Sequence, residues 1–147
     1  MRLTPAGAFT LVAPLPAPTA LPIGIAAGPD GNLWFAEAAG GRIGRIDPAT
    51  GATAEFPLPH AACQQPGFEG SSGTACQVEY LAVGPDGAMW FGEPWRNAPG
   101  RADAVGTVTE YPLPAPPSGE SGVGPLALGP DGALWFAANG AIGRFVP

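Results

Sequence analysis

Three segments of the chain read alike, and this internal repeat constrains the fold more than any other feature. The segments are IAAGPDGNLWFAE from Ile25, LAVGPDGAMWFGE from Leu81 and LALGPDGALWFAA from Leu126. The second GPDG word begins 56 residues after the first, and the third begins 45 residues after the second. These spacings are close to the repeat length of four-stranded propeller blades. The repeat therefore predicts a chain of similar units that pack on one another.

Each unit converts into strands by simple rules. Short apolar runs bounded by Gly, Pro and Asp are typical of strands, and Pro-Asp-Gly favours a tight reversal of the chain. In the first unit this pattern predicts strands at residues 23–27, 33–37, 42–46 and 54–58. The 23 glycines and 20 prolines interrupt every window long enough for a substantial helix. We therefore predict an all-β fold, a β-propeller of four-stranded blades with three blades in this chain.

The predicted organisation is a single domain of propeller repeats over residues 1–147, in which blade three lacks an outer strand of its own. Its parts are an N-terminal outer strand at 8–15, blade one at 23–58, an insertion at 60–77, blade two at 78–113 and blade three at 123–145.

Three blades are too few to close a ring, because propellers typically have four to eight. One hypothesis is a homodimer that forms a six-bladed ring, in which the strand at 8–15 of each copy completes blade three of the other. The alternative is that the chain is a piece of a longer propeller. Each predicted second strand carries a Trp-Phe pair, beginning at Trp34 in blade one, with one ring on each face. An open arc would thus leave one aromatic face wet at each end.

Charge and hydropathy exclude two classes of partner. The chain has six arginines, no lysine and twelve acidic residues, for a net charge of -6, so it lacks the basic surface that binds nucleic acid. Prolines interrupt every apolar run before it reaches the roughly 20 residues of a membrane helix, so we expect no membrane span. The N-terminus shows no clear signal peptide, and the sequence leaves the compartment open.

The words GPDGNLWFAE, GRIGRIDPATG and TAEFPLP together resemble the repeat of the virginiamycin B lyase family, also called streptogramin lyases. In that family the propeller has seven blades in one longer chain. The resemblance implies a β-propeller and a magnesium-dependent elimination that opens the ester linkage of a cyclic depsipeptide antibiotic, such as a streptogramin B. Such chemistry needs a general base and a cation, Mg²⁺, that stabilises the enolate-like charge.

The chain departs from the family in its histidines. Its one histidine, His60, lies in a long loop after the first PLP word and at no position where the resemblance places a catalytic histidine. His60 is the candidate base, and the alternative is a solvated loop residue. Glu37 and Glu93, each directly after a Trp-Phe pair, are the candidate Mg²⁺ ligands. The alternative is that each is a strand-end carboxylate bonded to backbone or to an arginine such as Arg42.

Two further pairs of residues stand out. Trp95 and Arg96 lie in the second loop of this kind, where they would line the mouth of a central funnel that takes a small-molecule or peptide ligand. The alternative for Trp95 is a cap on the core. Cys63 and Cys76 bracket the insertion, and a disulfide between them would contribute roughly 3 kcal/mol and hint at export. The alternative is two free thiols.

Two functions follow as hypotheses. The first is a propeller that binds a ligand or partner and has no recognisable catalytic histidine. The second is a magnesium-dependent carbon-oxygen lyase that linearises a cyclic depsipeptide. Because one fold hosts many activities, the sequence leaves open whether the protein is an enzyme.

Overall fold

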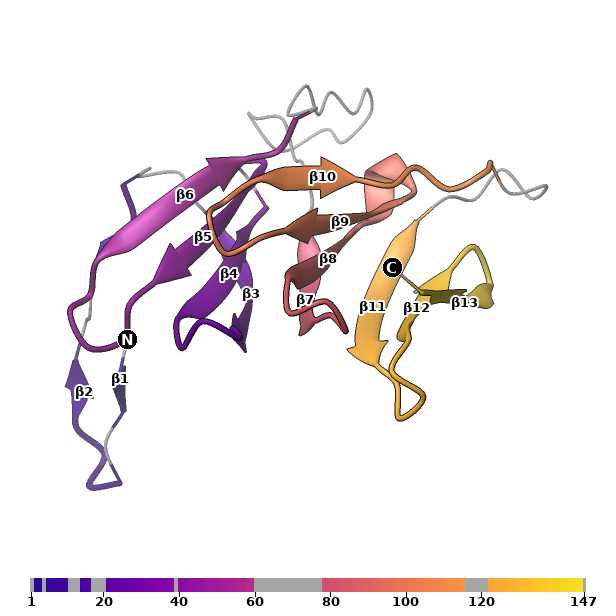
Figure 1. Ribbon diagram of the computed structural model, residues 1–147. Coiled ribbons are helices and arrows are strands. Elements are labelled where there is room, and N and C mark those ends of the chain that lie inside the picture. The colour runs from indigo at the N-terminus through magenta and orange to yellow at the C-terminus, as the bar shows by residue number, and fades with distance from the viewer. Residues whose placement is uncertain are drawn as a thin grey trace.

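The computed structural model describes residues 2–3, 5–10, 14–16, 21–38, 40–59, 78–115 and 122–146. Three antiparallel sheets stand side by side in an arc (Figure 1). One turn of 3-10 helix, η1 (Pro94–Arg96), is the only helix in these ranges, so the prediction of an all-β fold is confirmed. Among the same residues, no helix has the length and apolar character needed to cross a membrane.

Each sheet is one blade, a meander whose strands pair in the order of the sequence. In the first blade three of the four predicted strands begin or end at a predicted residue. The strands are β3 (Pro22–Ala27), β4 (Leu33–Glu37), β5 (Arg42–Ile46) and β6 (Thr53–Pro57) in blade one; β7 (Glu79–Val83), β8 (Met89–Glu93), β9 (Ala98–Ala102) and β10 (Val108–Glu110) in blade two; and β11 (Val123–Leu128), β12 (Leu134–Ala138) and β13 (Ala141–Phe145) in blade three. The first strands β3, β7 and β11 contact one another in succession, so they form the inner side of the arc.

The N-terminal segment differs from its prediction. We expected an unattached strand at residues 8–15, whereas β2 (Phe9–Thr10) pairs antiparallel with β1 (Arg2–Leu3). This hairpin lies at the blade one end of the arc, away from blade three (Figure 1). Within the described ranges, no strand pairs with the outer edge of β13. The strand β1 was not predicted, because a strand of two residues is too short to show an alternation of apolar and polar residues.

The core lies between blades. Trp34 is 1% exposed and stacks on Phe56 at 5.6 Å between ring centroids, and this face of blade one packs on Met89 and Phe91 of blade two. Between blades two and three, Trp90 is fully buried. Trp34 and Trp90 therefore each pack toward the next blade in the chain, as burial of large aromatic surface favours.

The sequence predicts that an open arc leaves one aromatic face exposed to water at each of its two ends. At the blade three end, Trp135 is 38% exposed, as predicted. At the blade one end, the prediction is wrong for Phe35, which is only 4% exposed. Its ring lies flat over Gly44 on the neighbouring strand, where an added Cβ would sit 2.1 Å from the ring. The most exposed of the large apolar residues in β3 is instead Ile25, at 67%.

The Asp of each GPDG word has a role that sequence reasoning missed. In blade two the Asp86 carboxylate accepts hydrogen bonds from Trp90 Nε1 at 2.9 Å and from Arg101 Nε. Blades one and three repeat this arrangement with Asp30 and Asp131. The signal was present, since each Asp stands four residues before the Trp.

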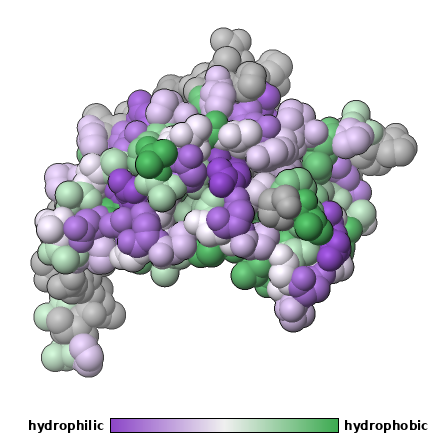
Figure 2. Space-filling model, viewed as in Figure 1, coloured by the Kyte–Doolittle hydropathy of each residue, from purple (hydrophilic) through white to green (hydrophobic). Residues whose placement is uncertain are grey.

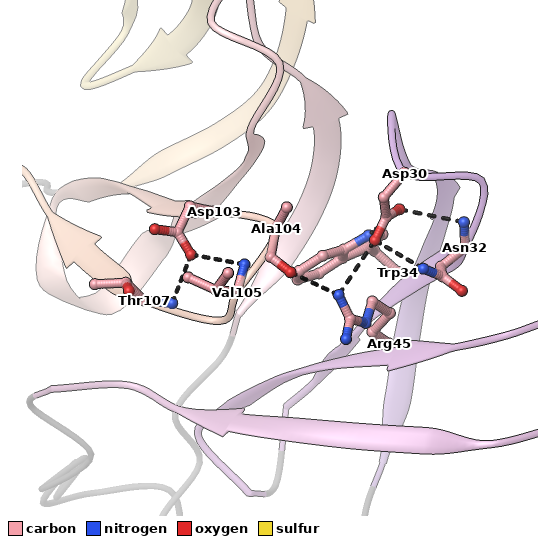
Figure 3. A network of polar contacts seen from close by, with 8 residues as sticks. All are labelled: Asp30, Asn32, Trp34, Arg45, Asp103, Ala104, Val105 and Thr107. Carbon is pink, nitrogen blue, oxygen red and sulfur yellow. Dashed lines mark hydrogen bonds and ion pairs between the residues drawn. The ribbon is translucent and has the colours of Figure 1, made fainter.

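The same network crosses between blades one and two. Arg45 donates to Asp30 at 3.3 Å and also to the carbonyl oxygen of Ala104, at 2.7 Å, in the turn between β9 and β10 (Figure 3). Asp103 shapes that turn by accepting hydrogen bonds from the amides of Val105 and Thr107. The Asp-Trp-Arg network therefore fixes the Trp rotamer and ties one blade to the next.

Replacing Asp86 with alanine should lower the free energy of unfolding by about 2 kcal/mol, because the buried Trp90 indole loses a charged acceptor. Asp131→Ala is the matched control, and it should cost less than about 1 kcal/mol because water reaches the exposed Trp135. Chemical denaturation measures both. Equal losses would contradict this account of burial.

Candidate functional site

The candidate site lies at one end of the blades, where the middle strands β4 and β8 finish and the chain turns into β5 and β9. Glu37 is the last residue of β4 and Glu93 is the last residue of β8. In an antiparallel meander the loops between blades meet the same end. This end therefore collects the predicted residues Glu37, Glu93, Trp95 and Arg96.

Glu37 belongs to a buried charged cluster in blade one. Its side chain is fully buried, and Arg42 Nη1 lies 3.8 Å from Glu37 Oε2 and 3.6 Å from Glu55 Oε2. Burial first, and then the charge of Glu55, raise the pKa of Glu37 to about 7, against the opposing effect of Arg42. No described residue donates a hydrogen bond to either Glu37 oxygen. A protonated Glu37 is able to donate to Glu55, and this compensates the burial.

Blade two repeats the cluster with different spacing. Glu93 is 3% exposed, and Arg96 Nε, from η1, lies 3.2 Å from Glu110 Oε2. Burial and the charge of Glu110 raise the pKa of Glu93 to about 8, and Arg96 opposes the shift. Each of the two blades thus has two glutamates and one arginine close together at this end. In blade three the residue at the end of the middle strand is Ala138.

These surroundings do not fit a divalent cation. Mg²⁺ prefers several ionised oxygen ligands, whereas Glu37 and Glu93 are buried, retain protons near neutral pH and lie beside an arginine. Across the part of the chain that the structure describes, no group of three His, Cys, Asp or Glu side chains is placed to hold a metal ion. We therefore derive no catalytic step through a metal at these two glutamates.

Trp95 and Arg96 both lie on η1, but their side chains have different surroundings. Trp95 is 46% exposed at this end of the blade. Arg96 instead forms the ion pair with the buried Glu110, so its charge is compensated within the blade. Pro94 lies close to the start of blade three, since its carbonyl oxygen would be 3.3 Å from a Cβ at Gly122. This short loop therefore presents a partly exposed aromatic ring at this end of the blade.

Two asparagines that sequence reasoning missed hold the loops together. Asn97 and Asn139 each precede a third strand with a φ near +54°, a conformation that Asn tolerates better than most residues. Asn139 Nδ2 donates to Asn97 Oδ1 at 2.9 Å, and Asn97 Nδ2 donates to the carbonyl oxygen of Pro114 at 3.1 Å. This chain of bonds links the site ends of blades two and three.

A further missed residue is Tyr80, on the inner strand β7. The first strand of every blade has a register shift near its start, and in blade two it falls between Glu79 and Leu81. Tyr80 sits in this bulge with φ +53° and is 43% exposed. Bulges that re-aim a side chain, and left-handed non-glycine residues, are enriched at functional sites. No pattern in the sequence signals this bulge.

Three predicted residues lie outside the described ranges. His60, Cys63 and Cys76 all fall within residues 60–77. The base and the disulfide therefore stay predictions.

Comparison with known proteins agrees with the resemblance found in the repeats. Residues 1–69 match the virginiamycin B lyase family. The virginiamycin B lyase of Bordetella bronchiseptica is 58% identical over 38 residues, which cover 26% of this chain and 12% of that protein. The aligned segment thus spans only a small part of the curated relative.

Solved structures cover more of the chain. The virginiamycin B lyase from Staphylococcus aureus superposes with a TM-score of 0.72 and 32% identity, covering 97% of this chain and 46% of that one. A catalytically inactive histidine-to-alanine variant of that enzyme, solved with quinupristin, gives a TM-score of 0.71. A gluconolactonase from Xanthomonas campestris, at 18% identity and a TM-score of 0.57, shares the fold alone. This chain spans less than half the length of the lyase structures, and its β-propeller repeats are similar to those of the virginiamycin B lyase family.

Proposed function

We propose that this protein binds a cyclic depsipeptide or a similar apolar peptide at the end of the blades that carries η1, and that it does so without catalysing its opening. The observation that carries this proposal is a difference in exposure at that end. The glutamates are buried in clusters that contain an arginine, whereas Trp95 is exposed. Exposed, rigid aromatic side chains are typical of recognition sites.

The ligand class comes from the comparison. The solved variant that contains quinupristin is 32% identical to this chain, and the resemblance in the repeats implies a cyclic depsipeptide. Tyr80 supports the same proposal, because the bulge in β7, the first strand of blade two, carries a second exposed aromatic ring. Together Tyr80 and Trp95 offer flat apolar surfaces with polar edges, which suit a ring of apolar side chains and ester or amide carbonyls.

Replacing Trp95 with alanine should weaken quinupristin binding by about 30-fold, as expected when an aromatic anchor is removed. Isothermal titration calorimetry measures the affinity, and Tyr80→Ala should act in the same direction. Val105→Ala is the control, because Val105 is 82% exposed in a turn at the opposite end of blade two. Equal affinities for Trp95→Ala and the wild type would contradict a site on η1, and no binding by the wild type would end the proposal.

The second candidate is the lyase, and the family match favours it. Its only histidine for proton removal is His60. Incubation with quinupristin and Mg²⁺ decides between the two functions, because elimination opens the ring without changing the mass. A product of unchanged mass and altered chromatographic retention, absent with His60→Ala, would establish the lyase and contradict pure binding.

A further inference from the structure

Asn97 ends the loop that carries Trp95 and ties this loop to the rest of blade two. It lies directly after η1 with a φ of +53° and is 7% exposed. Its backbone carbonyl oxygen accepts a hydrogen bond from the amide of Leu113 at 2.9 Å. Its side-chain Nδ2 donates to the carbonyl oxygens of Leu113, at 3.3 Å, and Pro114, at 3.1 Å. These bonds fasten the end of η1 to the segment that leaves blade two.

A second asparagine continues these bonds into blade three. Asn139, in the turn between β12 and β13, donates from Nδ2 to Asn97 Oδ1 at 2.9 Å. Asn139 Oδ1 accepts from the amide of Gly122, directly before β11, at 3.0 Å. We call the bonds from Gly122 through Asn139 and Asn97 to Pro114 the asparagine relay. It joins η1 to two parts of blade three, and η1 itself contacts β11.

Backbone groups at both ends fix the direction of the asparagine relay. The amide of Gly122 can only donate, so it meets Asn139 Oδ1, and Asn139 is left with Nδ2 to offer to Asn97. Asn97 therefore accepts through Oδ1, and its Nδ2 meets carbonyl groups, which can only accept. Turning either side-chain amide over would set like groups face to face beside the buried Asn97, which is costly. Only one arrangement of the two side chains satisfies every group.

Blade one shows that the backbone of this loop does not need an asparagine. In both blades four residues separate the paired ends of the second and third strands. The last of the four is Gly41 in blade one and Asn97 in blade two, with φ of +57° and +53°. The Gly41 carbonyl oxygen accepts from the amide of Leu58 at 3.0 Å, as that of Asn97 accepts from Leu113. Glycine meets these backbone demands, so the Asn97 side chain has another purpose in the loop that carries Trp95.

We propose that Asn97 and Asn139 are positioning residues for ligand binding at η1, and that the asparagine relay holds the Trp95 ring in place from blade three. Trp95 stands two residues before Asn97, so the bonds of Asn97 restrict how the ring can turn with its loop. Figure 2 shows hydrophobic surface over β11 to β13, in the blade to which the relay joins η1. Preorganisation of this kind reduces the entropy that is lost when a ligand binds. The role in ligand binding rests on the proposed function, whereas the effect on the ring does not.

The first test observes the Trp95 ring without a ligand. Its indole N–H resonance, in the NMR spectrum of the nitrogen-labelled protein, is assigned by its absence from Trp95→Phe. Asn97→Gly keeps the left-handed backbone that blade one forms with glycine but breaks the relay, so this resonance should shift. Asn139→Gly should shift it as well. The Trp90 resonance reports the packing of the blades and should stay in place, because that indole is held by its own carboxylate acceptor at 2.9 Å.

Two further variants sharpen this test. Asn139→Asp separates the two bonds of Asn139, because a carboxylate still accepts from the Gly122 amide but has no donor for Asn97. It should therefore shift the Trp95 resonance as Asn139→Gly does. Asn32→Ala is the control, since Asn32 lies in the turn before β4, at the opposite end of the blades, and it should leave the resonance in place.

Two results would overturn the proposal. One is a Trp95 resonance that stays in place in any of the three variants that break the relay. The other is a Trp90 resonance that moves as much as that of Trp95, because the relay would then act on the packing of the blades and not on the loop.

The second test measures binding. Asn97→Gly should weaken the affinity for quinupristin by about tenfold in isothermal titration calorimetry, the cost of ordering a freed loop and its side chain on binding. In a Trp95→Ala background the same change should have little further effect, because the positioning acts through the ring. Additive losses would overturn the positioning role and leave the ligand site in place. No binding by the wild type would end the proposed function, and the NMR shifts would still decide whether the relay positions Trp95.

Discussion

Replacing Gly100 with alanine should destabilise the protein by about 3 kcal/mol, the upper part of the usual range for overpacking a core. Gly100 pairs with Phe91 across β8 and β9, and the phenyl ring lies flat on it. An added Cβ would sit 2.0 Å from Phe91 Cε2, far inside van der Waals contact. Because Phe91 is fully buried between blades one and two, the ring has no free space into which it can move.

A double-mutant cycle checks the cause of this loss. Phe91→Leu removes the ring from Gly100, so the cost of Gly100→Ala should fall sharply in that background. Gly124→Ala is the matched glycine control. An added Cβ there meets nothing closer than the Ala137 carbonyl oxygen at 3.6 Å, so stability should change by less than about 0.5 kcal/mol. Chemical denaturation measures the wild type, the two single variants, the double variant and the control, and additive costs of Gly100→Ala and Phe91→Leu would contradict the ring contact.

A glycine lies opposite the Phe of the Trp-Phe pair in all three blades. Gly44 lies under Phe35 and Gly143 under Phe136 in the same way. A strand residue opposite an aromatic ring must be small for the ring to lie flat. The Phe of each Trp-Phe pair therefore requires a glycine at the paired position of the next strand. This explains why Phe35 stays buried although, among the described residues, no further blade covers its face.

Much of the fold was predictable because the repeat carries it. The strands at residues 33–37 and 42–46 were predicted to the residue, since GPDG and the following glycines mark their ends. The short hairpin of β1 and β2 was not, because its pairing depends on chain segments without a pattern. The bulge at Tyr80 was missed for the same reason. Bulges reflect packing of inner strands, which spacing does not encode.

The candidate site was less predictable than the fold. Glu37 and Glu93 were selected as Mg²⁺ ligands from their place after the Trp-Phe pair, and that role stays a prediction. The alternative of pairing with an arginine matches the ion pair between Glu37 and Arg42. Their partners Glu55 and Glu110 were missed, because each lies two strands away and joins its cluster only through sheet register. Register across three strands brings two like charges together, and a sequence motif does not reveal that.

Burial of like charges gives Glu93 a cost that depends on pH. The pKa of Glu93 is raised to about 8 from an ordinary value of 4.5, so between these values the folded state binds more protons than the unfolded state. Stability therefore falls as pH rises through this window and stays reduced above about pH 8. Glu37, with a pKa raised to about 7, adds to the same trend. The contribution of these two groups should make the free energy of unfolding larger in mild acid than in mild base.

Replacing Glu93 with glutamine should remove its share of this cost. Glutamine has the shape of a protonated glutamate and no charge, and it leaves the Arg96 and Glu110 pair in place. The variant should match the wild type near about pH 4 and exceed its free energy of unfolding by about 3 kcal/mol above about pH 8. Denaturant titrations of the variant and the wild type across this range measure the difference. A constant difference at all pH values, or a loss of stability at pH 8, would mean that Glu93 ionises in the folded protein without cost, and that the arginine compensates it fully.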